Sequence, residues 1–422
     1  MRRWKIILPS LIATTSLPFI SLVGCGEKTT IELSGGNTKL WGEVGEQGSD
    51  TNSWSLKKGT EILEATLEVV GPDKDKVGIT DGFITWNKNL EKRNYVFKIQ
   101  TTYDGKIYQS NDITLRVGPT ATSFESDSWD TVVWWANQGI DVLHHVYKNE
   151  CDNNPIEAFK GSLVGYQRNL SLKFDENTTQ TYPVKVIGEE QDNYGVDQQE
   201  LAALTFEFVN VISDADEAPL TTYRTLEVDG EFDMWHYWDC NVDACLNTQR
   251  PGEEPIPFWC DYPEMTKSVL QMIDDGGDLD LTDIKSVNRK ANESDDDGQT
   301  YQTIKTHRKL FLPNISDMYT EKGISQATRF NEDDLKFLMD ENSRDRKQYT
   351  YYKEFIGDGS IDGKFNELKK TSLSNQCADF YISSRCLNWG NFVYVASDYT
   401  FIITNSIYSY FNKYAVAPCF CI

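Results

Sequence analysis

The stretch YVFKIQTTYDGKIY, residues 95–108, decides how the N-terminal part of the chain folds. Large apolar residues occupy alternate positions from Tyr95 to Thr101, at Tyr95, Phe97 and Ile99. This is the period of a strand with one buried face. Asp104-Gly105 then supplies a two-residue turn, because both central positions of such a turn need positive φ. Lys106-Ile107-Tyr108 returns as the second strand. The stretch therefore predicts a β-hairpin.

Further strand-like segments flank this hairpin. Residues 65–70, 82–86 and 113–117 are short, rich in β-branched or aromatic residues, and bounded by Gly, Pro or Asp. We therefore expect residues 29–118, closed by Gly118-Pro119, to form an all-β immunoglobulin-like sandwich. The segment resembles the bacterial immunoglobulin-like modules that serve as stalks on surface proteins.

The N-terminus has the pattern of an export signal. Arg2, Arg3 and Lys5 precede an uncharged apolar run, Ile6–Val23, which two prolines interrupt. Such a run suits a signal peptide better than a stable membrane-spanning helix. No later segment approaches 18 uninterrupted apolar residues.

The apolar run ends in Leu22-Val23-Gly24-Cys25, which resembles the lipobox of bacterial lipoproteins, including surface lipoproteins of Firmicutes and mollicutes. Small residues admit the signal peptidase, and the Cys25 thiol is the nucleophile that accepts a diacylglyceryl group. We expect residues 1–24 to be a signal peptide and 25–28 the lipidated Cys25 with a short tether. The protein is then lipid-anchored in the cell membrane, on its extracellular face. The alternative is an ordinary signal peptide that happens to contain a cysteine.

The length and net charge of the chain limit the number of domains and the kinds of binding partner. A chain of 422 residues predicts two or three domains. Its 65 acidic residues against 41 basic ones give a formal net charge of −24. Such a field repels phosphate backbones, so we expect no nucleic-acid partner. The partners that remain are the membrane, reached through the lipid, and an extracellular glycan or protein ligand.

A second unit is expected over residues 119–422, with a β-rich first part at 123–225. Ser126 or Ser128 can cap a short helix that continues to Ala136, with Gly139 as its stop. Three tryptophans crowd this helix, and we expect core packing rather than a carbohydrate platform: Trp129, Trp134 and Trp135. Strands are predicted at 170–174, 184–187 and 204–209. Residues 273–300, rich in Asp, Asn, Ser and Gly, are expected to be solvated loops.

Several sequence motifs in this unit resemble those of a family without an assigned activity, domain of unknown function six-two-seven-three. The matching motifs are Asp283–Lys290, Lys309–Leu312 with Asp317–Tyr319, Gln348–Lys353, Tyr381–Arg385 and Ala415–Ile422. A looser match covers Ser123-Phe124, Ser128-Trp129 and residues 182–208. The chain departs from the family at a paired aromatic, which is Tyr381-Ile382 here, and at a glycine, which is Ala415.

The order of these motifs also resembles the layout of C-type-lectin-like folds. An aromatic strand at Tyr381–Arg385 is followed by a hairpin and by a final strand ending in Pro418-Cys419-Phe420. We therefore expect residues 226–422 to form an α+β, C-type-lectin-like head. This expectation is an analogy of fold and implies no activity.

The hypothesis for a ligand site rests on aromatic residues near the C-terminus. Trp389, Tyr394, Tyr399 and Tyr408 suit stacking on sugars, although cross-strand packing explains them as well. The expected function is non-catalytic binding or adhesion, with no catalytic residue. The alternatives are a structural coat protein, a glycan hydrolase, or a cysteine-dependent oxidase of the formylglycine type that uses Cys386, Cys419 or Cys421.

No cofactor is expected beyond a structural calcium ion as an alternative. Asp358, Ser360 and Asp362 have the opening spacing of a calcium loop, but Lys369 stands where a bidentate Glu is needed. A solvated acidic turn is favoured, and no metal site is predicted.

Cysteines and histidines give no catalytic pattern. With Cys25 lipidated, eight of the nine cysteines remain, an even number compatible with disulfides in an exported protein. His236 with Cys240, Cys245 and Cys260 lacks the spacing of a zinc knuckle. His144 and His145 lie near Cys151, but we expect them on a strand, pointing to opposite faces, which argues against a joint role.

Overall fold

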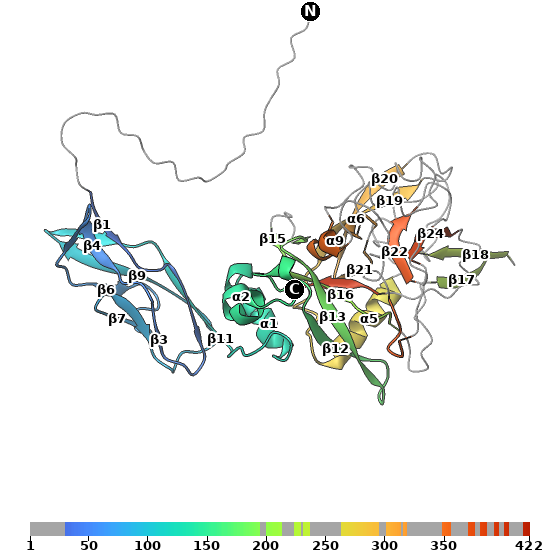
Figure 1. Ribbon diagram of the computed structural model, residues 1–422, viewed down its shortest axis with the longest axis horizontal. Coiled ribbons are helices and arrows are strands. Elements are labelled where there is room, and N and C mark those ends of the chain that lie inside the picture. Colours follow the sequence, from blue (N-terminus) through green and yellow to red (C-terminus); the bar gives the residue numbers. More distant parts are fainter. Residues whose placement is uncertain are drawn as a thin grey trace, which may run out of the picture. The chain divides into compact units, whose positions relative to one another are not determined.

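The computed structural model describes residues 30–194, 200–212, 223–228, 231–236, 263–294, 301–313, 315–318, 348–355, 370–375, 380–385, 392–395, 401–404 and 417–422. These residues are mostly β-sheet, with few helices (Figure 1). The chain divides into two compact units. The first holds residues 30–40, Gln47–Leu90 and Asn94–Leu115, and the second holds Trp41–Glu46, Glu91–Arg93 and Arg116–Ile422.

Eleven strands build the N-terminal sheets. They are β1 (Ile31–Ser34), β2 (Lys39–Glu43), β3 (Gly48–Ser49), β4 (Ser55–Lys58), β5 (Glu61–Leu63), β6 (Glu68–Val70), β7 (Val77–Thr80), β8 (Phe83–Trp86), β9 (Arg93–Tyr103), β10 (Lys106–Gln109) and β11 (Ile113–Gly118). Three sheets form, in the orders β1-β4-β5, β3-β8-β7 and β10-β9-β11-β2, with β6 paired to β9. The predicted strand at 65–70 begins only at Glu68.

The predicted hairpin is confirmed. Strands β9 and β10 pair antiparallel with Tyr103 opposite Lys106, so Asp104 and Gly105 form the two-residue turn. Both have positive φ, 49° and 69°, as a type I′ turn requires. Alternate residues of β9 are fully or almost fully buried: Tyr95, Phe97 and Ile99. Alternation thus places one face of β9 in the core.

The second unit begins with helices and then forms further sheets. Its helices are α1 (Trp129–Ala136), α2 (Ile140–Val146), α3 (Lys148–Asp152), the 3₁₀ turn η1 (Glu157–Phe159), α5 (Pro263–Gly276), α6 (Ile315–Met318) and α9 (Thr350–Phe355). Its strands are β12 (Gln167–Lys173), β13 (Thr179–Glu189), β14 (Asn193–Tyr194), β15 (Glu200–Leu201), β16 (Leu204–Phe208), β17 (Tyr223–Val228), β18 (Glu231–His236), β19 (Val287–Ser294), β20 (Tyr301–Arg308), β21 (Leu310–Phe311), β22 (Phe380–Arg385), β23 (Phe392–Val395), β24 (Phe401–Thr404) and β25 (Cys419–Cys421). Among these described residues, no helix combines the length and apolar character needed to cross a membrane.

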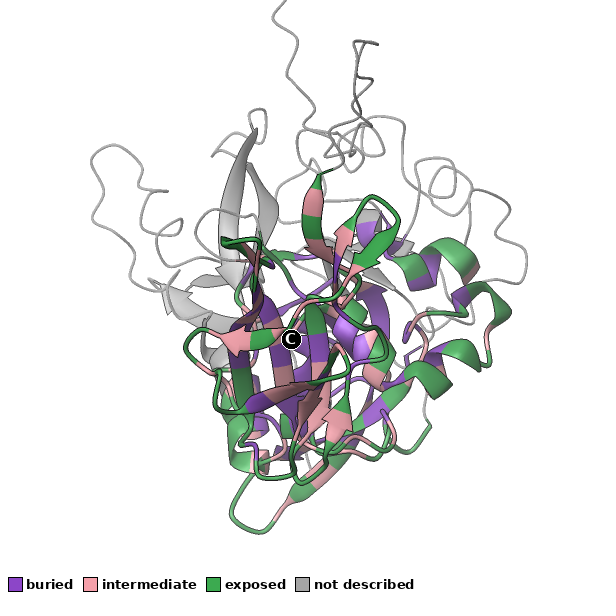
Figure 2. Cartoon of the chain, turned by 90° about the vertical axis from the view of Figure 1, so that its left-hand side faces the viewer, coloured by how far each residue is buried: buried purple, intermediate pink, exposed green. Residues whose placement is uncertain are grey.

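A five-stranded antiparallel sheet organises this unit, in the order β12-β13-β16-β25-β21. Its central strands are largely buried (Figure 2). The last strand of the chain, β25, lies between β16 and β21, with Phe420 opposite both Phe206 and Leu310. Smaller sheets have the orders β15-β14-β19-β20, β17-β18 and β22-β23-β24.

One face of this sheet is packed with aromatic rings. Phe206 stacks on Phe420 at 5.2 Å between ring centroids and meets the edge of Trp129 at 5.2 Å. Ser128 caps α1, since Thr131 N–H donates to Ser128 Oγ at 3.2 Å. The predicted cap is confirmed, and Trp129 and Trp135 are buried in the core as expected.

The expectation of loops over residues 273–300 is confirmed at 277–286, which are turns and irregular backbone, and is wrong at 273–276 and 287–294. The first part belongs to α5, and Val287–Ser294 forms β19, which pairs along its length with β20. Val269 and Ile273, one helical turn apart, are fully buried. This i,i+4 pair packs the helix against the core. The Asp-rich composition of the residues after Ile273 predicted loops instead.

Candidate functional site

Most of the predicted site residues fall outside the described residues. This is true of Cys25, Trp389, Tyr399 and Tyr408, and of the calcium-loop candidates Asp358, Ser360 and Asp362. Tyr394 lies on β23, opposite Tyr381 and Ile402, where only the backbone is described. In the part of the chain that the structure does describe, no three His, Cys, Asp or Glu side chains gather as a metal site would require.

The polar chemistry of the second unit gathers on the face of the sheet opposite the aromatic rings. Side chains alternate along β16, so Phe206 points to one face while Thr205 and Glu207 point to the other. We call six buried residues on this second face the polar layer: Asp192, Thr205, Glu207, Tyr349, Tyr352 and Lys370.

Glu207 is the centre of the polar layer. Its Oε2 atom lies 2.8 Å from Lys370 Nζ and accepts a hydrogen bond of 2.6 Å from the Tyr352 hydroxyl. Lys370 Nζ also donates to the carbonyl of Phe208 at 2.7 Å. The side chains of Glu207 and Lys370 are 0% and 3% exposed, so water takes no part in the pair. Among the described residues, nothing hydrogen-bonds Glu207 Oε1.

Asp192 is the second carboxylate in this layer. It accepts hydrogen bonds from Thr205 Oγ1 at 2.5 Å and from the Tyr349 hydroxyl at 2.9 Å. The neighbouring Gln191 Oε1 accepts from the backbone N–H of Thr350 at 3.0 Å, at the start of α9. These bonds fasten the first turn of α9 to the sheet.

The ring of Tyr351 completes this attachment, because Lys185 Nζ of β13 lies 3.6 Å from its centroid. Burial, followed by the charge and hydrogen bond of Glu207, raises the pKa of Tyr352 well above its ordinary value. Tyr352 therefore remains a hydrogen-bond donor at every physiological pH. The polar layer holds charges and hydrogen-bond donors in fixed, buried positions.

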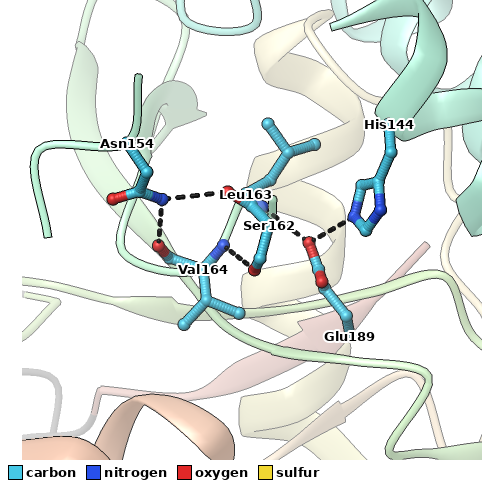
Figure 3. A network of polar contacts seen from close by, with 6 residues as sticks. All are labelled: His144, Asn154, Ser162, Leu163, Val164 and Glu189. Atoms are coloured by element: carbon cyan, nitrogen blue, oxygen red, sulfur yellow. Dashed lines mark hydrogen bonds and ion pairs between the residues drawn. The ribbon is translucent and has the colours of Figure 1, made fainter. Parts of the chain in front are cut away.

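A second polar network lies at the end of β13 (Figure 3). His144 Nε2 lies 2.9 Å from Glu189 Oε1, and the same oxygen accepts from Leu163 N–H at 2.7 Å. Nearby, the Asn154 amide donates to the carbonyls of Ser162 and Val164 at 2.9 and 3.0 Å. The network ties α2 and the loop before β12 to the sheet.

The charge of Glu189 sets the protonation of His144. Burial lowers the pKa of His144, but the hydrogen bond to Glu189 and the charge of that carboxylate outweigh it, and the net shift is upward. The prediction of a strand at His144-His145 is wrong, because both lie on helix α2. Burial, followed by the charge of Lys148, lowers the pKa of His145, so the pKa values of the two neighbouring rings shift in opposite directions.

The described cysteines are all buried. Cys151 is a free thiol, and burial, followed by the charge of Glu189, raises its pKa to about 12. Cys419 and Cys421 lie on β25 with 0% exposure, and Cys421 Sγ lies 3.4 Å from Thr205 Oγ1. A thiolate nucleophile needs a lowered pKa and access to substrate, and Cys151 has neither. Cys386 lies outside the described residues.

Several of the motifs quoted for the family resemblance lie in or against this sheet, whereas Tyr381–Arg385 belongs to β22 in the separate sheet β22-β23-β24. Gln348–Lys353 supplies α9 and its anchoring tyrosines, and residues 182–208 supply β13 and β16. The motif Ala415–Ile422 supplies β25, and Lys309–Leu312 supplies its neighbour β21. Lys285, in the motif Asp283–Lys290, donates its backbone N–H to the carbonyl of Cys421 at 2.9 Å.

Glu207, Asp192 and Lys370 were not among the residues predicted from the sequence. One signal was present: Leu204-Thr205-Phe206-Glu207-Phe208 is a strand with a single carboxylate among apolar residues. A charge at the centre of a buried strand needs a partner. The partner, Lys370, is distant in the sequence, and no local pattern identifies it.

No protein-family model matches the chain, and no curated protein matches it. Among solved structures, the chain is similar to one described as tandem Ig repeats of Dlar, with 17% sequence identity and a TM-score of 0.17. The match covers 22% of this chain and 52% of that chain, so the chain spans about half the length of the structure it matches.

Proposed function

We propose that the chain is a lipid-anchored protein of a bacterial cell surface that binds an extracellular ligand and has no catalytic centre. One observation carries the proposal. A basic start, an uncharged apolar run and Leu22-Val23-Gly24-Cys25 follow one another in the order that export and lipidation require.

The architecture that goes with this function is a stalk and a head. Strands β1–β11 begin a few residues after Cys25 and are proposed to be an immunoglobulin-like stalk. The second unit is proposed to be a C-type-lectin-like head related to the family of unknown activity named above. Its ligand surface would include Trp389, Tyr394, Tyr399 and Tyr408. Because the net charge is −24, a neutral glycan or a protein is a better ligand than a polyanion.

The polar layer supports a non-catalytic function for the second unit. Its carboxylates, Asp192 and Glu207, are fully buried and hydrogen-bonded to tyrosine hydroxyls rather than arranged around a free space. Glycoside hydrolysis needs two carboxylates that flank the bond to be cut. Buried groups such as these hold α9 on the sheet instead.

The anchoring is tested by expressing the full-length chain in a bacterial host that is fed an alkyne-labelled fatty acid. The expected result is a labelled protein that partitions into detergent, and a Cys25→Ser variant that carries no label. The matched control is Cys151→Ser, which removes a buried thiol and should keep the label. Equal labelling of the wild-type protein and Cys25→Ser would overturn the proposal.

Ligand binding is tested with residues 26–422 on arrays of glycans and host proteins, with calcium and with a chelator. Saturable binding to one ligand class is expected, together with its loss in a Trp389→Ala, Tyr394→Ala variant. Tyr108→Ala, on strand β10, is the control and should bind normally. Absence of binding by a folded protein would favour a coat protein, and loss with the chelator alone would bring a calcium loop into the site.

A further inference from the structure

Glu207 and Lys370 are placed as the two reactants of an amide bond. Their side chains come from segments far apart in the sequence, and Nζ lies 2.8 Å from Oε2 in a site from which water is excluded. Groups held at this separation react as if at a very high concentration.

The hydrogen bonds that an amide product needs are already present. Tyr352 donates to Glu207 Oε2 at 2.6 Å, where it would hold the amide carbonyl and stabilise the negative charge that develops on it. Lys370 Nζ donates to the Phe208 carbonyl at 2.7 Å, which would accept from the amide N–H. Glu207 Oε1, which no described residue hydrogen-bonds, is the oxygen without a place in the product.

We propose that Lys370 and Glu207 join through an intramolecular isopeptide bond, with Tyr352 polarising the carboxyl group. Lys370 Nζ attacks Glu207 Cδ, the Nζ–Cδ bond forms, and the bond from Cδ to Oε1 breaks. In the ion pair the ammonium carries three protons. One stays on the amide nitrogen and two leave with Oε1 as water, so the step balances with no oxidant or other reactant.

The bond would change what holds the second unit together. The segment at 370–375 is otherwise fixed to the end of β16 by hydrogen bonds, such as those from Asn210 Nδ2 to Thr371 and Ser372. A covalent link makes this attachment permanent and removes two buried charges, which are costly to keep out of water. The proposal does not depend on lipidation or on ligand binding.

The test is mass spectrometry of the wild-type full-length chain, denatured and digested with trypsin. The expected product is one branched peptide that joins residues 186–224 to residues 370–385, lighter by one water than the two peptides together. Trypsin does not cut after an acylated lysine, so cleavage at Lys370 should be lost. Two separate linear peptides, with cleavage after Lys370, would overturn the proposal.

Variants establish the role of each group. Lys370→Arg keeps the positive charge but cannot form the bond, and it should yield only linear peptides. Tyr352→Phe should slow the appearance of the branched peptide after synthesis by roughly 100-fold, the usual effect of removing one such donor. Lys353→Arg, at an exposed position of α9, is the matched control and should give the wild-type branched peptide. Because the wild-type digest is decisive by itself, a variant that fails to fold leaves the test intact.

Discussion

Phe206 and Glu207 are neighbours on β16, both are completely buried, and they point to opposite faces of one sheet. On the first face, Phe206 lies among Phe124, Trp129 and Phe420, and burial is favourable at every contact. On the second face, Glu207 is tolerable only because Lys370 and Tyr352 reach it. The apolar face therefore supplies stability, whereas the polar face fixes the positions of the elements that pack on it.

The largest effect is expected on the apolar face. Phe206→Ala removes a ring that touches three other aromatic side chains and leaves a cavity at the centre of the sheet. We expect a loss of about 4 kcal/mol in the free energy of unfolding, measured by denaturant titration. Phe206→Leu, which refills most of the volume, should lose less than half as much. Equal losses would contradict this expectation and would show that the ring contacts themselves, rather than the filled volume, stabilise this face.

The next effect tests the polar face. Lys370→Ala leaves the Glu207 carboxylate buried without its cation, and we expect it to be about 3 kcal/mol less stable than Lys370→Arg, which keeps the charge and also lacks the amide bond. The double variant Glu207→Met, Lys370→Met replaces both groups with apolar ones and should unfold within about 1 kcal/mol of Lys370→Arg. If the double variant loses as much as Lys370→Ala, the polar face contributes stability itself and the comparison fails.

A smaller effect is expected at the other carboxylate of the polar layer. Tyr349→Phe removes the hydroxyl that donates to Asp192 but keeps the ring. Thr205 still donates to Asp192, so we expect a loss of only about 1.5 kcal/mol. The same change should speed hydrogen exchange at the start of α9, because Tyr349 anchors that end. Unchanged exchange there would remove Asp192 from the attachment of α9.

The smallest effect depends on pH and lies at the end of β13. Since the pKa of His144 is raised in the folded state, its stabilising effect is fully present below the unfolded value of about 6.5. It is lost as the pH rises through the folded pKa. We therefore expect the free energy of unfolding of the wild-type protein to be higher than that of His144→Gln by less than about 1 kcal/mol at pH 5.5. At pH 9 the two values should differ little.

His145→Gln is the control for this pH dependence. The pKa of His145 is lowered in the folded state, so its protonation opposes folding at low pH. The stability of His145→Gln relative to the wild-type protein should therefore increase as the pH falls, whereas that of His144→Gln should decrease. Thermal unfolding across the pH range measures both. If the relative stability of both variants changed with pH in the same direction, the pH dependence could not be attributed to the pairing of His144 with Glu189.

Local patterns allowed much of the secondary structure to be predicted. The Asp104-Gly105 turn, the Ser128 cap and the strands at 170–174, 184–187 and 204–209 depend on neighbours in the sequence, and the structure has them. The helix at His144-His145 and the helix α5 were missed. The predicted loop began at Ile273, because Asp274, Asp275, Asp278 and Asp280 follow it closely, and this acidic composition concealed the end of α5.

The candidate site could not be predicted in the same way. Glu207 could be recognised as a charge in an apolar strand, but Lys370 and Tyr352 are ordinary residues in their own segments. They become partners of Glu207 only because α9 and the segment at 370–375 both pack against β16. The ligand aromatics Trp389, Tyr394, Tyr399 and Tyr408 remain a prediction.

The sequence by itself determined the features that depend on short-range chemistry: the export pattern that ends at Cys25, the hairpin at Asp104-Gly105, and the alternation that gives β16 two faces. What each face of β16 contacts depends on long-range packing. It places β25, the end of the chain, beside β16, and it brings Lys370 to Glu207. The physical reason is that burial selects partners by space and charge, and neither is recorded in the spacing of residues along the chain.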